Sequence, residues 1–77
     1  MEVTIKYFGL LAEVTNQNEE TLVFSSTSIS ELLEALYIKY PALKEKDFQV
    51  AQNLEIVSKE ASITATEIAL LPPFSGG

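Results

Sequence analysis

The sequence predicts a single small α+β domain, in which one long helix packs across a mixed sheet of four to five strands. Apolar residues alternate with polar ones at the start and near the end of the chain, as they do in half-buried strands. In the middle of the chain the apolar residues recur at helical spacing instead. At 77 residues, the chain has room for only one hydrophobic core.

The first part of the chain contains two predicted strands joined by a short helical turn. Residues 2–8 alternate between apolar and polar side chains, and Phe8 falls on the polar face. We expect a helical turn at residues 10–14 and, after an Asn-Gln-Asn turn, a second strand at residues 21–24. Together these segments make a loose hairpin.

The main helix is predicted over about residues 29–40. Ser28 and Glu31 match a capping box, in which a hydroxyl and a carboxylate each accept a hydrogen bond from a backbone N–H group of the first turn. Pro41 ends the helix, because the residue before a proline avoids the α conformation. The apolar stripe of the helix consists of Ile29, Leu32, Leu33, Leu36 and Tyr40.

The second half of the chain returns to strand patterns after a charged loop at residues 44–47. Strands are predicted at residues 48–52, 54–57 and 67–71, with a turn at Asn53. Two strands, one helix and two or three further strands is the element order of a β-grasp, or ubiquitin-like, roll. A ferredoxin-like fold would require a second full helix.

The composition excludes several classes of function. The chain contains no cysteine, histidine or arginine, so we expect no disulfide, no histidine-based catalysis and no metal site. Its net charge of −6 makes nucleic acid a poor partner and favours a basic protein surface. No stretch resembles a signal peptide or is long enough to cross a membrane, so we expect a cytoplasmic protein.

The chemistry is expected at the end of the chain. We predict a folded domain at residues 1–71 and an extended tail at residues 72–77, because Pro72 and Pro73 stop a strand. Glycines without a Cβ atom let the backbone enter a narrow channel and present its terminal carboxylate. Once activated as an acyl-adenylate, this carboxylate can accept sulfur and become a thiocarboxylate. The alternative is a frayed terminus that happens to end in glycine.

A docking surface is expected around the root of the tail. Phe8 lies on the polar face of its strand, Leu71 faces outward if its neighbours point inward, and Phe74 lies beyond the sheet. With Pro72 and Pro73, these residues are candidates for an apolar patch that contacts a partner protein. Alternatively, these apolar side chains only cover the hydrophobic core and contact no partner.

These residues carry a resemblance to a known family. The chain begins Val-Thr-Ile-Lys-Tyr-Phe-Gly at residues 3–9, reads Val-Ala-Gln-Asn at residues 50–53 and ends Leu-Leu-Pro-Pro-Phe-Ser-Gly-Gly. Over essentially its whole length it resembles the MoaD-type small subunit of molybdopterin synthase, a ubiquitin-like sulfur carrier. The Pro-Pro-x-x-Gly-Gly ending is the specific part of the resemblance.

The resemblance implies a set of roles and partners. Gly77 would be adenylated by an E1-like, MoeB-type enzyme that uses ATP, and would then be thiocarboxylated. Ser75 and Gly76 would thread into a MoaE-type large subunit, where Gly77 donates sulfur to cyclic pyranopterin monophosphate. The catalytic side chains would belong to the large subunit, in a heterotetramer of two small and two large subunits. The chain itself would bind no cofactor.

The sequence also departs from the family pattern and leaves alternatives open. The family usually has an Asp-Gly-Asp-like turn before the last strand, whereas residues 63–67 read Ile-Thr-Ala-Thr-Glu. The alternatives are a sulfur carrier for thiamine thiazole synthesis, a modifier that is joined to lysines, and an interaction domain with an inert tail. The Pro72-Pro73 step and Phe8-Gly9 argue against the thiazole carrier.

Overall fold

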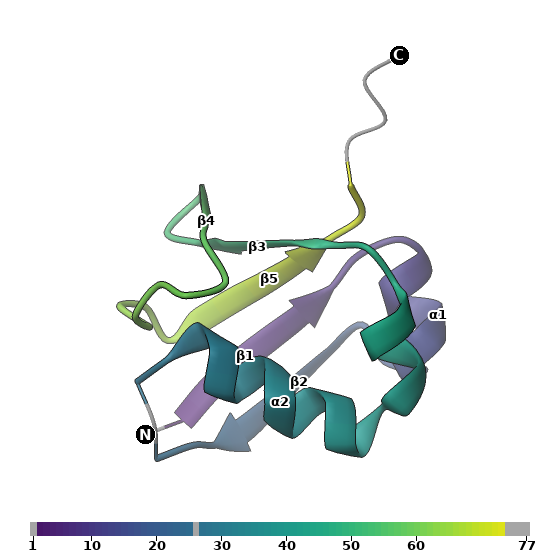
Figure 1. Ribbon diagram of the computed structural model, residues 1–77, viewed down its shortest axis with the longest axis horizontal. Helices are drawn as coiled ribbons and strands as arrows, with labels where there is room; N and C mark the ends of the chain where they lie inside the picture. The colour runs from purple at the N-terminus through teal and green to yellow at the C-terminus, as the bar shows by residue number, and fades with distance from the viewer. Residues whose placement is uncertain (1, 26, 74–77) are drawn as a thin grey trace.

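A computed structural model describes residues 2–25 and 27–73, which form a five-stranded mixed sheet with one main helix (Figure 1). The strands are β1 (Glu2–Tyr7), β2 (Glu19–Val23), β3 (Gln49–Gln52), β4 (Glu55–Val57) and β5 (Glu67–Leu71). The helices are α1 (Leu10–Thr15), α2 (Ile29–Lys39) and the 3-10 helix η1 (Pro41–Glu45). This arrangement confirms the predicted β-grasp fold.

The first and last strands pair at the middle of the sheet. The strand order is β2-β1-β5-β3-β4, and β1 runs parallel to β5 with Ile5 opposite Ile68. The other neighbouring strands are antiparallel. Because successive side chains of a strand point to opposite faces, Val3, Ile5 and Tyr7 are buried while the residues between them are not.

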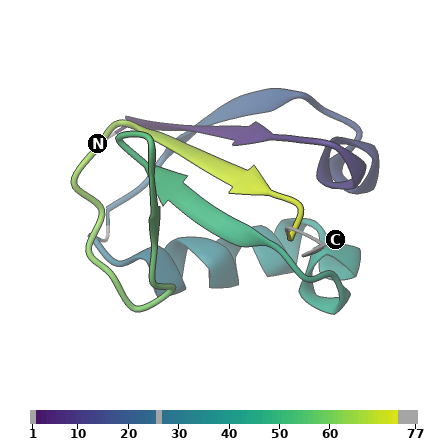
Figure 2. The ribbon, with the colours of Figure 1, turned by 90° about the horizontal axis from the view of Figure 1, so that it is seen from above.

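Helix α2 covers one face of the sheet, as Figure 2 shows from above. Ser28 caps it by accepting a hydrogen bond at 3.4 Å from the backbone N–H of Glu31, which agrees with the hydroxyl half of the predicted capping box. Ile29, Leu32, Leu33 and Leu36 are buried in the core, and Tyr40 is half-buried at the end of the helix. Among the described residues, none of the helices is long and apolar enough to span a membrane.

The predicted ends of strands and helices lie within one residue of the observed ones, except at the start of β2 and in the segment after α2. β2 begins at Glu19, two residues before the predicted start, because its register with β1 extends to a pair between Lys6 and Glu19. The 3-10 helix η1 was missed, since its charged residues suggested a loop. Pro41 suits the first turn of a helix, and Leu43 is completely buried, so packing stabilises a segment that ends in two charged residues.

Gln52 builds the turn that the family motif would otherwise supply. Its side-chain amide donates to the backbone carbonyl of Ser62 at 2.8 Å, and its carbonyl oxygen accepts from the backbone N–H of Thr64 at 2.9 Å. The Gln52 side chain is buried, so both of its polar ends are satisfied inside the fold. A side chain of β3 therefore holds the segment before β5 in place of an Asp-Gly-Asp turn.

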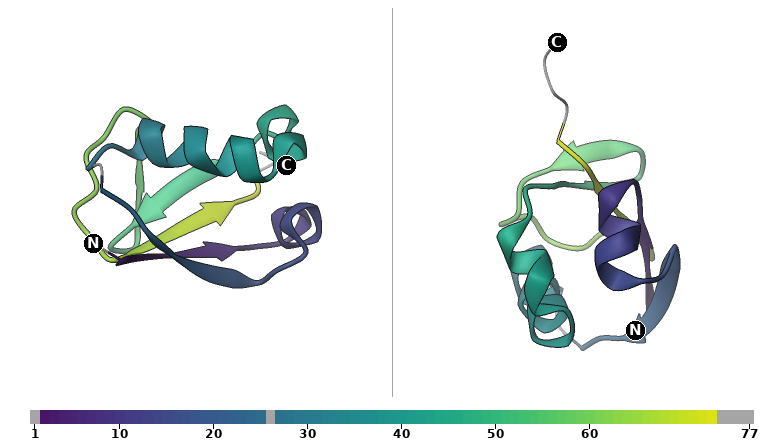
Figure 3. Two further views of the ribbon diagram at one scale, coloured as in Figure 1. Left: turned by 90° about the horizontal axis from the view of Figure 1, so that it is seen from below. Right: turned by 90° about the vertical axis from the view of Figure 1, so that its right-hand side faces the viewer.

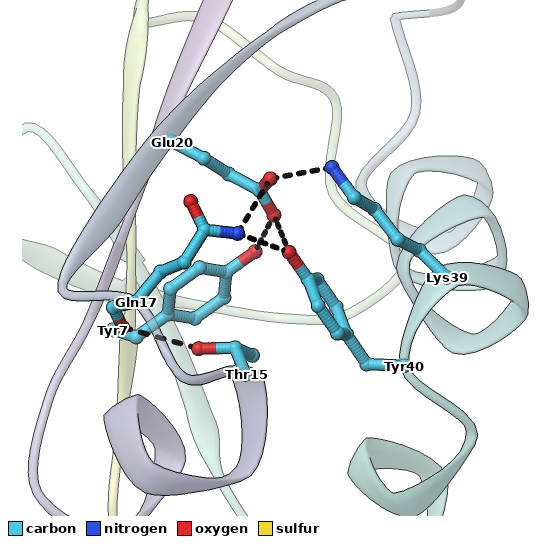
Figure 4. Close-up of polar contacts among 6 residues, drawn as sticks. All are labelled: Tyr7, Thr15, Gln17, Glu20, Lys39 and Tyr40. Atoms are coloured by element: carbon cyan, nitrogen blue, oxygen red, sulfur yellow. Dashed lines mark hydrogen bonds and ion pairs between the residues drawn. The ribbon is translucent and has the colours of Figure 1, made fainter.

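A nearly buried carboxylate ties β2 to the end of α2 (Figure 4). The Glu20 side chain exposes only 8% of its surface. It accepts hydrogen bonds from Tyr7 Oη at 2.6 Å, Tyr40 Oη at 2.8 Å and Lys39 Nζ at 2.6 Å. A longer bond of 3.3 Å comes from Gln17 Nε2. These donors belong to β1, the α1–β2 connection and the end of α2, so one carboxylate joins three parts of the fold.

The same contacts alter the pKa values of the cluster. Burial alone would raise the pKa of Glu20, but the hydrogen bonds from Lys39, Tyr7 and Tyr40 outweigh it and hold the pKa of this carboxyl below its usual range. Burial and the bond to Glu20 raise the pKa of Tyr7. The carboxylate is therefore ionised and the tyrosine neutral at physiological pH, which is the state that the hydrogen bonds require.

The Glu20 cluster predicts a pH-dependent contribution to stability. A carboxyl whose pKa is lowered by folding stabilises the native state above its unfolded pKa, and this contribution is lost as the pH falls through the folded pKa. We expect Glu20→Gln to reduce the free energy of unfolding by about 2 kcal/mol at pH 7. The deficit should shrink at acid pH, as measured by urea denaturation at several pH values. Glu19→Gln, at an exposed neighbour, is the control, and a deficit independent of pH would contradict the assignment.

Candidate functional site

The root of the tail lies at the end of the central strand β5, where Leu71 is the last strand residue and Pro72 and Pro73 are exposed. Figures 1 and 3 (right) show this end of β5 leading out of the domain on the side away from α2. The predicted site residues Phe74, Ser75, Gly76 and Gly77 lie outside the described residues. Their roles stay predictions, and the described part of the site is the surface at the root of the tail.

A groove crosses the face of the sheet opposite to α2, and we call it the outer-face groove. It is lined by Lys6, Phe8, Ala51, Gln52, Asn53, Leu54, Ile56, Glu67, Ala69 and Leu71. Its floor follows from the register, which places Ala69 beside Ala51 on neighbouring strands. These two small side chains lie between larger ones, so the face is hollow at its centre.

Phe8 and Leu71 form one end of the outer-face groove, which places both on the face predicted for them. Phe8 is 44% exposed, and its backbone N–H donates to the carbonyl of Leu70 at 3.2 Å. Ile68 and Leu70 are fully buried, so Leu71 lies on the outer face, as expected from alternation. The two predicted contact residues therefore line one groove although they are distant in the sequence.

The outer-face groove carries little charge. An ion pair joins Lys6 Nζ to Glu67 Oε2 at 3.4 Å, and both side chains are substantially exposed. A surface pair of this kind contributes little to stability, and its opposite charges cancel locally. The rest of the described lining is mostly aliphatic or aromatic. Such a surface suits contact with an apolar protein surface better than capture of a charged small molecule.

Pro72 and Pro73 line a different cavity from the outer-face groove. They share it with Leu10 and Leu11 of α1 and with Lys46 and Asp47, just after η1. Leu10 is 54% exposed, whereas Leu11 is buried. The structure thus separates the predicted docking residues into two surfaces, with the root of the tail between α1 and the groove.

Gly9 follows Phe8 of the outer-face groove and lies against Pro72 of the second cavity, and no sequence pattern predicted a site role for it. Its backbone has φ +56° and ψ −132°, a conformation that residues with a side chain rarely adopt. A Cβ atom at this position would lie 2.8 Å from Cγ of Pro72. The absence of a side chain therefore allows Pro72 to pack against the end of β1. Gly9 and Pro72 are far apart in the sequence, so a local sequence pattern could not predict their contact.

Comparison with known proteins identifies the family. The model of the ThiS family matches residues 5–77. The chain belongs to the ThiS family. Two curated relatives of similar length agree with this placement. The chain is 35% identical to the molybdopterin synthase sulfur carrier subunit of Chlamydomonas reinhardtii and 34% identical to that of Caenorhabditis briggsae, each over 83 aligned positions.

The similarity extends over complete chains and includes a solved structure. The two alignments cover 100% of this ThiS-family chain, and 100% and 99% of the relatives. The crystal structure of the small archaeal modifier protein 1 from Haloferax volcanii superposes with a TM-score of 0.76. It is 28% identical, and the match covers 100% of both chains. The resemblance to the MoaD-type carriers is therefore confirmed at the level of the family.

The contact between Gly9 and Pro72 predicts a measurable coupling. We expect Gly9→Ala to lower the free energy of unfolding by about 2 kcal/mol, because it adds both backbone strain and a steric clash. Pro72→Ala removes the atom that clashes, so the double variant should be more stable than the sum of the single effects predicts. Urea denaturation of the four proteins measures this coupling. Gly9→Ala with Pro73→Ala is the control and should be additive, and additivity with Pro72→Ala would contradict the contact.

Proposed function

We propose that this protein is the sulfur carrier subunit of a molybdopterin synthase and that the terminal carboxylate of Gly77 carries the sulfur. The supporting observation is the full-length identity of 34–35% to two proteins of that name. The Gly-Gly terminus and the apolar groove beside the root of the tail suit this role. The fold supplies a docking surface, and the tail supplies the reacting group.

The proposed chemistry takes place at one carbonyl carbon. A carboxylate is a poor electrophile, so an activating enzyme first transfers AMP from ATP to a carboxylate oxygen and releases pyrophosphate. A sulfur nucleophile then displaces AMP and leaves a thiocarboxylate on Gly77. Attack of this sulfur on a side-chain carbon of the pterin displaces an oxygen substituent from that carbon and forms a thioester. Water then cleaves the bond between the carbonyl carbon and the sulfur, leaving the sulfur on the pterin and the carboxylate on the carrier. Each cycle therefore uses one ATP and one sulfur donor and regenerates the chain.

The proposal assigns the catalytic side chains to a partner. The chain contains no histidine or cysteine that could act as a base or hold a persulfide. A MoaE-type large subunit would bind the pterin and receive residues 75–77 in a channel, and a MoeB-type enzyme would activate Gly77. A narrow channel suits a tail that ends in two residues without Cβ atoms. The heterotetramer stays a prediction of the family resemblance.

A second candidate function is supported by the archaeal structure. A protein named as a small modifier shares 28% identity with this chain over its full length. The same activated Gly77 could react with a lysine amine and form an isopeptide bond instead of accepting sulfur. The two functions share the activation step and differ in the acceptor. A covalent adduct of the chain with other proteins in a cell lysate would favour the modifier.

The role of the tail predicts the outcome of an intact-mass experiment. Incubation with the E1-like enzyme of the same genome, ATP and a sulfur source should replace one oxygen of the chain by one sulfur. Removal of Gly77, or addition of a residue after it, should abolish this change without lowering Tm, because β5 ends at Leu71. A reaction without ATP is the control. An unchanged mass with an active enzyme would contradict the carrier and favour an interaction domain with an inert tail.

The docking surface predicts the effect of charge at the root of the tail. Leu71→Lys or Phe74→Lys should weaken binding to the large subunit about tenfold, because a charge would be buried without a partner in an apolar interface. Isothermal titration calorimetry measures the affinity. Val23→Lys is the matched control, because Val23 is 85% exposed on the edge strand β2. Equal affinities for the three variants and the wild type would place the interface elsewhere.

A further inference from the structure

The backbone around Gly9 is hydrogen-bonded on both sides. Before it, the backbone N–H of Phe8 donates to the carbonyl of Leu70 on the neighbouring strand at 3.2 Å. After it, the backbone N–H groups of Leu11 and Ala12 donate to the carbonyls of Phe8 and Gly9, each at 3.1 Å, where helix α1 begins. Gly9 is therefore held between the sheet and a helix.

The tail side of the contact with Gly9 is less constrained. Strand β5 ends at Leu71, and Pro72 and Pro73 lack the backbone N–H group that could continue its ladder. Both prolines are exposed, and they line a cavity beside α1, so there is space around them. Where the two segments press against each other, the tail is therefore the one that moves.

The two prolines make the root of the tail stiff. A proline fixes its own φ angle at about −65° and disfavours the α conformation in the residue before it. Leu71 and Pro72 each precede a proline, so both are restricted to extended conformations. The ring of Pro72 is also closed onto its own backbone nitrogen, so the ring cannot shift without moving the chain. A displacement of Pro72 is therefore passed on to the residues that follow it.

Small changes at Pro72 have large effects at the end of the chain. Residues 73–77 follow Pro72, and a fully extended segment of that length reaches about 17 Å. A change of about 10° in the direction of the chain at Pro72 would therefore move its end by up to about 3 Å. Misplacement of a reacting group by about 1 Å can slow a reaction about a hundredfold. The reactivity of a chain terminus thus depends on how its root is held.

We propose that Gly9 is a positioning residue for the tail: the space left by its missing side chain fixes where Pro72 lies, and so the direction in which the tail leaves the domain. A Cβ atom at residue 9 would lie 2.8 Å from Cγ of Pro72, which is too close for two carbon atoms. The consequence for reactivity rests on the proposed function, in which a carboxylate oxygen of Gly77 attacks the α-phosphorus of ATP and pyrophosphate leaves. Gly9 would act on this step only through the orientation of the tail.

The kinetics of activation test this role. Gly9→Ala should lower kcat of adenylation by the E1-like enzyme of the same genome about tenfold, because the carboxylate is misdirected. KM for the chain should change by less than about twofold, because the surface of the domain is unaltered. Pyrophosphate release at saturating ATP, well below the lowest Tm, measures both constants. Ile63→Ala is the control for destabilisation alone, because Ile63 is buried before the start of β5, and it should leave both constants unchanged.

Rescue by a second substitution tests the contact itself. Pro72→Ala removes the Cγ atom that a side chain at residue 9 would meet. Gly9→Ala should therefore lower kcat much less in the Pro72→Ala background than in the wild type. Pro73→Ala is the matched control, and in that background the full loss should persist. An equal loss in all three backgrounds would contradict the contact as the route to the tail.

A distance measurement follows the direction of the tail without any partner. The chain contains no cysteine, so Ile38→Cys on α2 and Ser75→Cys in the tail place two spin labels specifically. Ile38 is 84% exposed, so a label there leaves the core intact. Gly9→Ala should shift or broaden the distribution of distances between the labels, as measured by pulsed electron paramagnetic resonance. In the Pro72→Ala background this change should be much smaller.

Three further outcomes would overturn the inference. A normal kcat for Gly9→Ala with a lowered Tm would show that the contact with Pro72 serves stability alone. An equal loss of kcat in Ile63→Ala would show that the rate follows stability. An unchanged distance between the labels would show that the direction of the tail does not depend on Gly9. Failure of the proposed function is distinguishable: the wild-type chain would then accept no sulfur, and the label distances would still decide the role of Gly9.

Discussion

The parallel pairing of β1 with β5 is the constraint on which the rest of the structure depends. It places the first strand beside the last at the centre of the sheet, with Ile5 opposite Ile68 and Tyr7 opposite Leu70. Parallel strands cannot be joined by a tight turn, so the intervening chain must cross over, and α2 lies in that connection. The crossover covers one face of the sheet and leaves the other face open.

The same pairing builds the root of the tail from both ends of the chain. Phe8 and Gly9 follow β1, Leu71 and Pro72 lie at the end of β5, and the two segments meet because the strands are parallel. The tail therefore continues from a strand that is hydrogen-bonded to a neighbouring strand on each side. The terminal group proposed to react would gain from this arrangement, because a rigid root reduces the conformations that binding must restrict.

The two faces of the sheet differ in how their apolar side chains are covered. The face toward α2 buries the apolar residues of β1 and β5, and the Glu20 cluster secures the end of the helix to β2. The open face has two alanines at its centre and apolar residues at both ends. In the proposed function, the open face would contact a partner and the terminal carboxylate would carry the sulfur, which requires no histidine or cysteine from this chain.

The sequence by itself determined the strands, the main helix and the expected chemistry, since period-two alternation, helical spacing and the Gly-Gly ending are local patterns. It also indicated the outward positions of Phe8 and Leu71. Only the tertiary structure decided what depends on distant residues: the hydrogen bonds of Gln52 to Ser62 and Thr64, the buried Leu43 of η1, and the contact of Gly9 with Pro72. The φ angle of +64° at Leu54 and the exposure of its side chain likewise come from the structure.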